Sequence, residues 1–144
     1  MLIMLLPEQV SQKWDMIKPA IKDVVGASNG SVDMNQVLMS MLDGRMQCWL
    51  SCRKEKDQLV IEGLITTEVL EDSHGNIRSL LIYSMYGYRM DRRSSWEGAF
   101  ETLVRFAKGH ECERIVTYTN VRSLISLMEQ LGGDASKRFV SIPI

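Results

Sequence analysis

The chain has 144 residues, which suits a single domain with one hydrophobic core. Seventeen Lys and Arg against 18 Asp and Glu leave a net charge of −1, which excludes a protein that holds nucleic acid by bulk positive charge. Apolar residues make up 45% and charged residues 24%, a composition of folded globular proteins rather than disordered ones. The three cysteines show no framework spacing and favour free thiols in a reducing cytoplasm.

The first half of the chain predicts a short strand, two helices and an antiparallel sheet. Residues 2–6 favour a buried strand, and Pro7 begins an amphipathic helix that extends to Val25, with a kink or split at Pro19. Residues 31–44 predict a second helix, capped by Asp33 and stopped by Gly44. The strands that follow are joined by turns and should form a meander. Their ranges are 46–52, 59–70 and 77–85.

The second half predicts alternating helices and strands. A helix after residue 94 ends near Gly109, a strand covers 114–119, a helix covers 121–131 and a last strand covers 139–142. Strand, helix and strand form a crossover unit, so 114–119 should lie parallel to 77–85. The predicted order is β-α-α-β-β-β-α-β-α-β, an α/β (α+β) fold with a mixed, mostly antiparallel sheet in one domain, 1–144.

This order resembles that of the GNAT superfamily, the acyl-CoA-dependent N-acyltransferases. Two segments carry the likeness besides topology: 82–119, which includes the loop 86–95, and 120–133, where Asn120, Ser123 and Gly132 fit the family outline. The nearest likeness is to divergent GNAT-like proteins of phages and prophages. It rests on the start at Leu6-Pro7-Glu8-Gln9-Val10, on Gly44-Arg45-Met46-Gln47-Cys48-Trp49, and on Phe106-Ala107 with Cys112-Glu113-Arg114-Ile115.

The resemblance implies that strand 77–85 splays from strand 114–119 and that the pantetheine arm of acyl-CoA lies in the gap. It also implies that the following loop wraps the pyrophosphate with backbone amides, since a helix start favours an anion. The implied acyl-CoA-binding residues are Tyr83, Met85, Arg92, Arg93, Ser94, Ser95 and Asn120. The glycines that the family carries at the helix start are replaced by Ser94, Ser95 and Trp96. The tyrosine that often serves the family as general acid toward the leaving thiolate is replaced by Ser126-Leu127.

Acyl transfer to an amine needs a base, and the strand over 59–70 offers two carboxylates. Glu62 and Glu68 are six residues apart and share a sheet face if the strand is regular. The alternative is that both are solvated strand residues. Tyr118 and Tyr83 can each donate a proton near the gap, or serve as packed aromatic side chains with a wet hydroxyl.

The remaining polar motifs have two interpretations each. Arg92 and Arg93 can hold phosphate oxygens, or form a solvated pair of charges. His110 and Cys112 offer two metal ligands, but no second pair accompanies them, so no metal is expected. Cys48 and Cys52 are too far apart along a strand for a shared metal or a disulfide.

The resemblance therefore implies an N-acetyltransferase that moves the acetyl group of acetyl-CoA to an amine of a small molecule or protein. The alternative is a catalytically inactive GNAT-like phage protein, a virion or protein-binding component. We expect the bacterial host cytoplasm, or the virion for that alternative, and neither a membrane nor a nucleic acid partner; a homo-oligomer stays open. If Trp96 turns away from the gap between strands 77–85 and 114–119, the enzyme is favoured. If Trp96 or Tyr88 fills that gap, the alternative is favoured.

Overall fold

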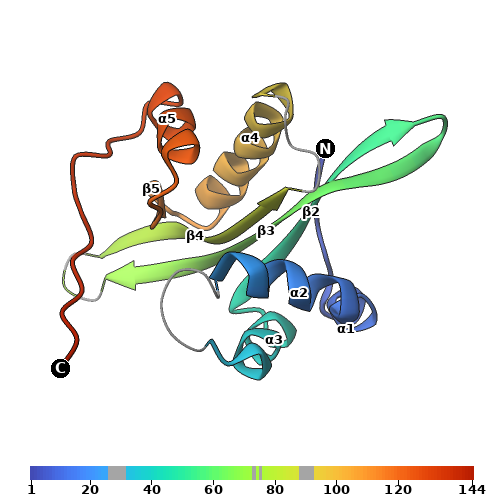
Figure 1. Ribbon diagram of the computed structural model, residues 1–144, viewed down its shortest axis with the longest axis horizontal. Helices are drawn as coiled ribbons and strands as arrows, with labels where there is room; N and C mark the ends of the chain where they lie inside the picture. Colours follow the sequence, from blue (N-terminus) through green and yellow to red (C-terminus); the bar gives the residue numbers. More distant parts are fainter. Residues whose placement is uncertain (26–31, 73, 75, 88–92) are drawn as a thin grey trace.

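A twisted sheet separates two layers of helices in the computed structural model (Figure 1). The structure describes residues 1–25, 32–72, 74, 76–87 and 93–144, apart from the side chains of 93–95. The described strands form one sheet in the order β1-β2-β3-β4-β5. They are β1 (Leu2–Met4), β2 (Met46–Glu55), β3 (Gln58–Asp72), β4 (Ile77–Gly87) and β5 (Arg114–Thr117).

The helices divide unevenly between the two faces of the sheet. Three lie on one face: α1 (Pro7–Gln12), α2 (Trp14–Val25) and α3 (Met34–Leu42). Two lie on the other: α4 (Arg93–Gly109) and α5 (Arg122–Gln130). Within the part of the chain that is described, no helix combines the length and the apolar character needed to cross a bilayer.

The strand pairing confirms the predicted fold class. β1, β2, β3 and β4 pair antiparallel in sequence order, and β5 pairs parallel to β4 after the crossover through α4. Successive side chains of β2, β3 and β4 point to opposite faces of the sheet and join the core on each face. The middle of each of these strands is therefore buried on both sides. The hairpin between β2 and β3 turns at Lys56 and Asp57, whose φ angles are 51° and 64°. The strands therefore extend further than predicted, because this turn needs only two residues.

The predicted split of the first helix at Pro19 is wrong, because the helix is divided earlier. The chain leaves helical geometry at Lys13, the C-cap of α1, whose amide still donates to the Gln9 carbonyl at 3.0 Å. Pro19 lies inside α2 instead. A proline there costs one backbone hydrogen bond, and the full burial of Ile17 and Ile21 on either side of it holds the helix on the sheet. The described order is therefore β-α-α-α-β-β-β-α-β-α.

The third helix begins and ends close to its predicted signals. The Asp33 carboxylate accepts a hydrogen bond from the Asn35 amide at 3.0 Å, which satisfies one of the free amides at the start of α3. At the other end Gly44 follows the C-cap with a φ of +85°, a conformation that glycine adopts without a steric penalty.

The predicted last strand, 139–142, is wrong. Residues from Gly133 onward form no helix or strand, and no described strand pairs with them. An alternating apolar pattern stabilises a strand only when a neighbouring strand satisfies its backbone groups. Among the described residues no strand supplies that pairing.

Candidate functional site

The candidate site lies where β4 parts from β5. β4 pairs with β3 along its whole length, from Ile77 opposite Asp72 to Gly87 opposite Gly63. It pairs with β5 only from Ser79 to Ile82, which lies opposite Thr117. Beyond Ile82 the outer edge of β4 has no strand partner among the described residues.

A bulge in β4 lies at the same place. Thr66 of β3 lies opposite Ser84 and Thr67 opposite Ile82, so Tyr83 is an extra residue without a partner. Bulges bend a strand and increase its local twist. The bulge coincides with the end of the β4–β5 pairing at Ile82. The buried hydroxyls of Thr66 and Ser84 hydrogen-bond to each other across the bulge.

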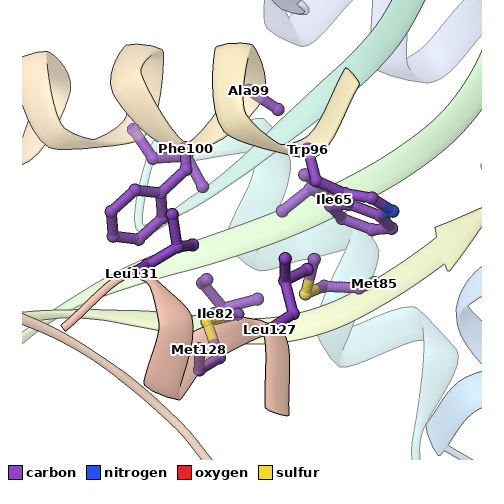
Figure 2. A pocket seen from close by; sticks show the side chains of 10 residues that line it. Ile65, Ile82, Met85, Trp96, Ala99, Phe100, Leu127, Met128 and Leu131 are labelled. Carbon is purple, nitrogen blue, oxygen red and sulfur yellow. The ribbon is translucent and has the colours of Figure 1, made fainter. Parts of the chain in front are cut away.

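An apolar pocket lies above the parting point, between the sheet, α4 and α5 (Figure 2). Side chains from all three surround it. They are Ile65, Ile82, Met85, Trp96, Ala99, Phe100, Leu103, Leu127, Met128 and Leu131. The Trp96 ring lies on the side of Met85, whereas Phe100 lies beside Leu131 at the other end (Figure 2). The free space is about 10 Å³, roughly what one water needs. Trp96 therefore faces into the pocket and does not turn away from it.

The opposite face of the sheet places Glu68 beside Tyr83. Glu68 is half-buried on β3 directly opposite Leu81, and Tyr83 is the next β4 residue on that face. Burial and, to a lesser degree, the negative charge of Glu68 raise the pKa of the Tyr83 hydroxyl. Tyr83 is thus protonated at neutral pH and lies close to a carboxylate at the point where the strands part.

Glu62 lies elsewhere. It occupies a second bulge, between the Ser51–Gly63 and Cys52–Ile61 pairs, and its buried carboxylate is held by the Arg53 guanidinium at 2.9 Å. Six residues of strand separate it from Glu68, about 20 Å at ~3.3 Å per residue. The two carboxylates therefore cannot serve one amine, and the structure brings only Glu68 to the parting point.

The other predicted residues fall into three groups. Met85 lines the pocket, and Tyr118 follows the last paired residue of β5 by one position, with 67% of its surface exposed. Asn120 is exposed in the connection to α5. Arg92 lies outside the described residues. The backbone of Arg93, Ser94 and Ser95 forms the first turn of α4, and their side chains also lie outside the described part.

The cysteines and His110 do not gather into a site. Cys48 and Cys52 are buried, and burial raises the pKa of Cys48 to about 12. The His110 ring lies 4.1 Å from that of Phe106, and its Nδ1 lies 3.0 Å from the Phe106 carbonyl oxygen. Within the described ranges no three His, Cys, Asp or Glu side chains converge as a metal site would require.

Sequence reasoning missed the bulge at Tyr83 and the contribution of α5 to the pocket. Leu127 and Leu131 follow the four-residue spacing of a helix face, so α5 was visible as amphipathic. Nothing in the sequence shows that this face covers a gap rather than a continuous sheet. The bulge depends on strand register, which a single sequence does not define at one residue.

Comparisons with known proteins bear on the fold. No protein-family model matches the sequence, and a search of curated proteins finds no match. Three solved structures are similar over nearly their whole lengths. A "probable acetyltransferase" has a TM-score of 0.71 at 14% identity, with all of this chain and 97% of that chain covered. An aminoglycoside acetyltransferase from an uncultured soil metagenomic sample, in complex with sisomicin, has a TM-score of 0.71 at 13% identity, covering 100% and 94%.

A predicted acetyltransferase with acetyl-CoA from Clostridium acetobutylicum has a TM-score of 0.68 at 14% identity, with 99% and 95% covered. Sequence identities this low show a shared backbone arrangement and do not show a shared activity. The resemblance read from the element order is confirmed at the level of the fold, and the phage likeness is not tested by these structures. The chain has the GNAT fold.

Proposed function

We propose that the protein is an acyl-CoA-dependent N-acetyltransferase that moves an acetyl group from acetyl-CoA to an amine. One observation carries the proposal: β4 loses its β5 partner at Ile82 and continues for five residues, 83–87, beside an apolar pocket. A slender pantetheine arm carries amide groups that can lie along a strand edge no longer covered by β5, and an apolar stretch that suits the pocket. The similarity of the fold to solved acetyltransferases also supports acetyl transfer as the function.

The residues at the parting point supply the groups that the reaction needs. An amine acceptor must lose a proton before its nitrogen can attack the thioester carbon, and Glu68 is the carboxylate near the gap that can take that proton through a water. As the new C–N bond forms, the C–S bond breaks and the thiolate leaves. Tyr83, protonated at neutral pH, can give the thiolate a proton. Backbone amides of β4 beyond Ile82 can stabilise the developing oxyanion.

The pocket must open for this function. Its free space is far below the volume of a pantetheine arm, and Trp96 in the first turns of α4 lines it. In this state the chain resembles a closed form, and ligand binding must include the cost of moving Trp96. α5 has no buried residue of its own, which makes it the element that can shift with least loss of packing.

Calorimetric titration with acetyl-CoA tests the proposal. We expect heat of binding for the native chain, and tighter binding for Trp96→Ala, because the pocket is then already open. Leu59→Ala, on the exposed hairpin, should bind as the native chain does. Absence of heat from both the native chain and Trp96→Ala at millimolar acetyl-CoA, a range typical of weak substrates, would overturn the proposal.

Glu68→Gln tests the chemistry separately from binding. CoA release with a panel of primary amines should fall by roughly 10²-fold or more, the usual contribution of a general base, whereas acetyl-CoA affinity should stay the same. Glu71→Gln, a more exposed carboxylate on the same strand, is the matched control and should leave the rate near that of the native chain. An unchanged rate in Glu68→Gln would remove Glu68 from the reaction.

A second candidate function is favoured by the position of Trp96. A filled pocket is what a GNAT-fold protein without catalysis would show, acting by binding another protein, as in the virion or protein-binding role implied by the phage likeness. This candidate predicts that neither the native chain nor Trp96→Ala binds acetyl-CoA. The same titration therefore separates the two functions.

A further inference from the structure

The bulge at Tyr83 changes which side chains of β4 face the pocket. In a regular strand, side chains three positions apart point to opposite faces of the sheet. Ile82 and Met85 are three positions apart, yet both line the pocket (Figure 2). Tyr83 and Tyr86 are also three apart, and both pack against the core on the α1–α3 face. The extra residue therefore reverses the facing of every β4 residue that follows it.

A regular register would exchange Met85 and Tyr86. Without the bulge β4 would continue regularly beyond Ile82, and a shift by one residue turns each later side chain to the other face. Met85 would then join the core on the α1–α3 face, and Tyr86 would point toward the pocket. The pocket has a free space of about 10 Å³, far too little for the larger tyrosine side chain. The bulge therefore decides whether a thioether or a phenol lines the candidate pocket.

The hydroxyl groups of Thr66 and Ser84 favour the bulged register. They hydrogen-bond across the bulge, and their residues expose only 0% and 3% of their surfaces. In the regular register Ser84 would turn to the apolar face that lines the pocket and would leave Thr66. Each hydroxyl would then be buried without this partner, and a buried polar group that loses its hydrogen bond is costly.

We propose that Thr66 and Ser84 are positioning residues of the candidate site, whose hydroxyl pair keeps Met85 in the pocket and Tyr86 out of it. The consequence for acetyl-CoA rests on the proposed function. The placement of the two side chains does not depend on it.

Thr67 offers a matched comparison. It lies on the other side of the register shift and is as fully buried as Thr66. Its hydroxyl accepts a hydrogen bond from Trp49 and donates one to Gln47, each at 2.9 Å. Both partners belong to β2, so these bonds hold β3 to β2, whereas the Thr66 hydroxyl holds β3 to β4. Loss of the Thr67 hydroxyl should therefore destabilise the chain without changing the register of β4.

NMR of the chain labelled with ¹³C at its methionine methyl groups tests the placement. In the native chain we expect nuclear Overhauser contacts between the Met85 methyl and the Trp96 ring, which lies on the side of Met85 (Figure 2). Thr66→Val keeps the size of the side chain and removes the hydroxyl, so these contacts should be lost. Ser84→Ala removes the same bond from the other strand and should give the same loss.

Two further variants separate positioning from stability. Thr66→Ser retains the hydroxyl and should retain the contacts between Met85 and Trp96. Thr67→Val should also retain them, although it costs more stability than Thr66→Val. Contacts that are absent from the native chain, that persist in both Thr66→Val and Ser84→Ala, or that Thr67→Val loses equally would overturn the proposal.

Calorimetry with acetyl-CoA measures the consequence for binding. Thr66→Val and Ser84→Ala should bind roughly tenfold more weakly than the native chain, the reduction expected when about one chain in ten keeps the competent register. Thr66→Ser and Thr67→Val should bind as the native chain does. Equal affinity of all these chains would overturn the positioning role. If neither the native chain nor Trp96→Ala binds acetyl-CoA, the proposed function fails, and the methyl contacts still decide whether the hydroxyl pair sets the register.

Discussion

The two faces of the sheet differ in how tightly their helices are packed. Under α1–α3, Ile17, Ile21 and Leu64 are fully buried. On the other face α4 buries Ala99, Leu103 and Ala107 at helical spacing, whereas α5 buries none of its residues completely. The candidate pocket lies beneath α5. The first face thus supplies stability, and the second keeps an element that can move to admit a ligand.

The largest expected effect is on the tightly packed face. Ile21→Ala should lower the free energy of unfolding by about 3 kcal/mol, because it opens a cavity among fully buried neighbours. Urea unfolding followed by circular dichroism measures the loss. Met39→Ala, exposed on α3, should change stability by less than ~0.5 kcal/mol. A loss below ~1 kcal/mol for Ile21→Ala would show that this face is not the more tightly packed one.

Two adjacent threonines allow the faces to be compared through hydrogen bonds. Thr67 faces α4, where its hydroxyl accepts from Trp49 Nε1 and donates to Gln47 Oε1, both at 2.9 Å. Thr67→Val leaves the buried indole N–H without an acceptor and should cost about 2 kcal/mol. Thr66→Val loses one hydroxyl–hydroxyl bond, to Ser84, and should cost about 1 kcal/mol. Equal losses in urea unfolding would contradict this difference.

The alkaline stability of the α1–α3 face depends on Cys48. Burial raises its pKa from 9.0 to about 12 in the folded chain. Above pH 9 the unfolded chain therefore releases the thiol proton while the folded chain keeps it, so stability falls as pH rises. The stability difference between the native chain and Cys48→Ala should shrink by about 1.4 kcal/mol between pH 8 and pH 10. Urea unfolding in reducing buffer at both pH values tests this, and a constant difference would contradict it.

The smallest effect on stability is expected in α5. Leu127 is only partly buried, so Leu127→Ala should cost less than ~1 kcal/mol. The same change should alter acetyl-CoA affinity more than Ile21→Ala does, because Leu127 lines the pocket. Thermal unfolding and calorimetry of the two variants side by side check both statements. A loss as large as that of Ile21→Ala would remove the contrast between the faces.

Much of the fold could be predicted because local patterns and tertiary contacts agree. Alternating apolar residues between polar turns identify β2, β3 and β4, and helical spacing identifies α4 and α5. The predictions that were wrong required knowledge of distant contacts. Pro19 stays inside α2 because of burial on the sheet, and no described strand pairs with 139–142 despite its strand character. Propensity alone does not report either condition.

The site was harder to predict than the fold. Tyr83 and Glu68 were singled out from their strands, but their proximity follows from a register that includes a bulge. Glu62 has the same residue type on the same strand, but it is buried in a second bulge and ion-paired with Arg53, and no sequence pattern separates it from Glu68. The pocket also depends on where Trp96 points, which no spacing in the sequence determines.

The β2–β3 hairpin has a consequence for how the sheet opens. The N-terminal segment bonds β2 as far as Cys52, whose backbone hydrogen-bonds to Met1. From there to the Lys56–Asp57 turn β2 and β3 continue as a two-stranded ribbon that projects from the sheet (Figure 1). Such a ribbon is only marginally stable alone. Amide protons of its outer half should therefore exchange with deuterated solvent through local fraying, whereas those near Ile65 should exchange only on global unfolding. Amides of the one strand β3 would thus span the range from exchange by local fraying to exchange by global unfolding.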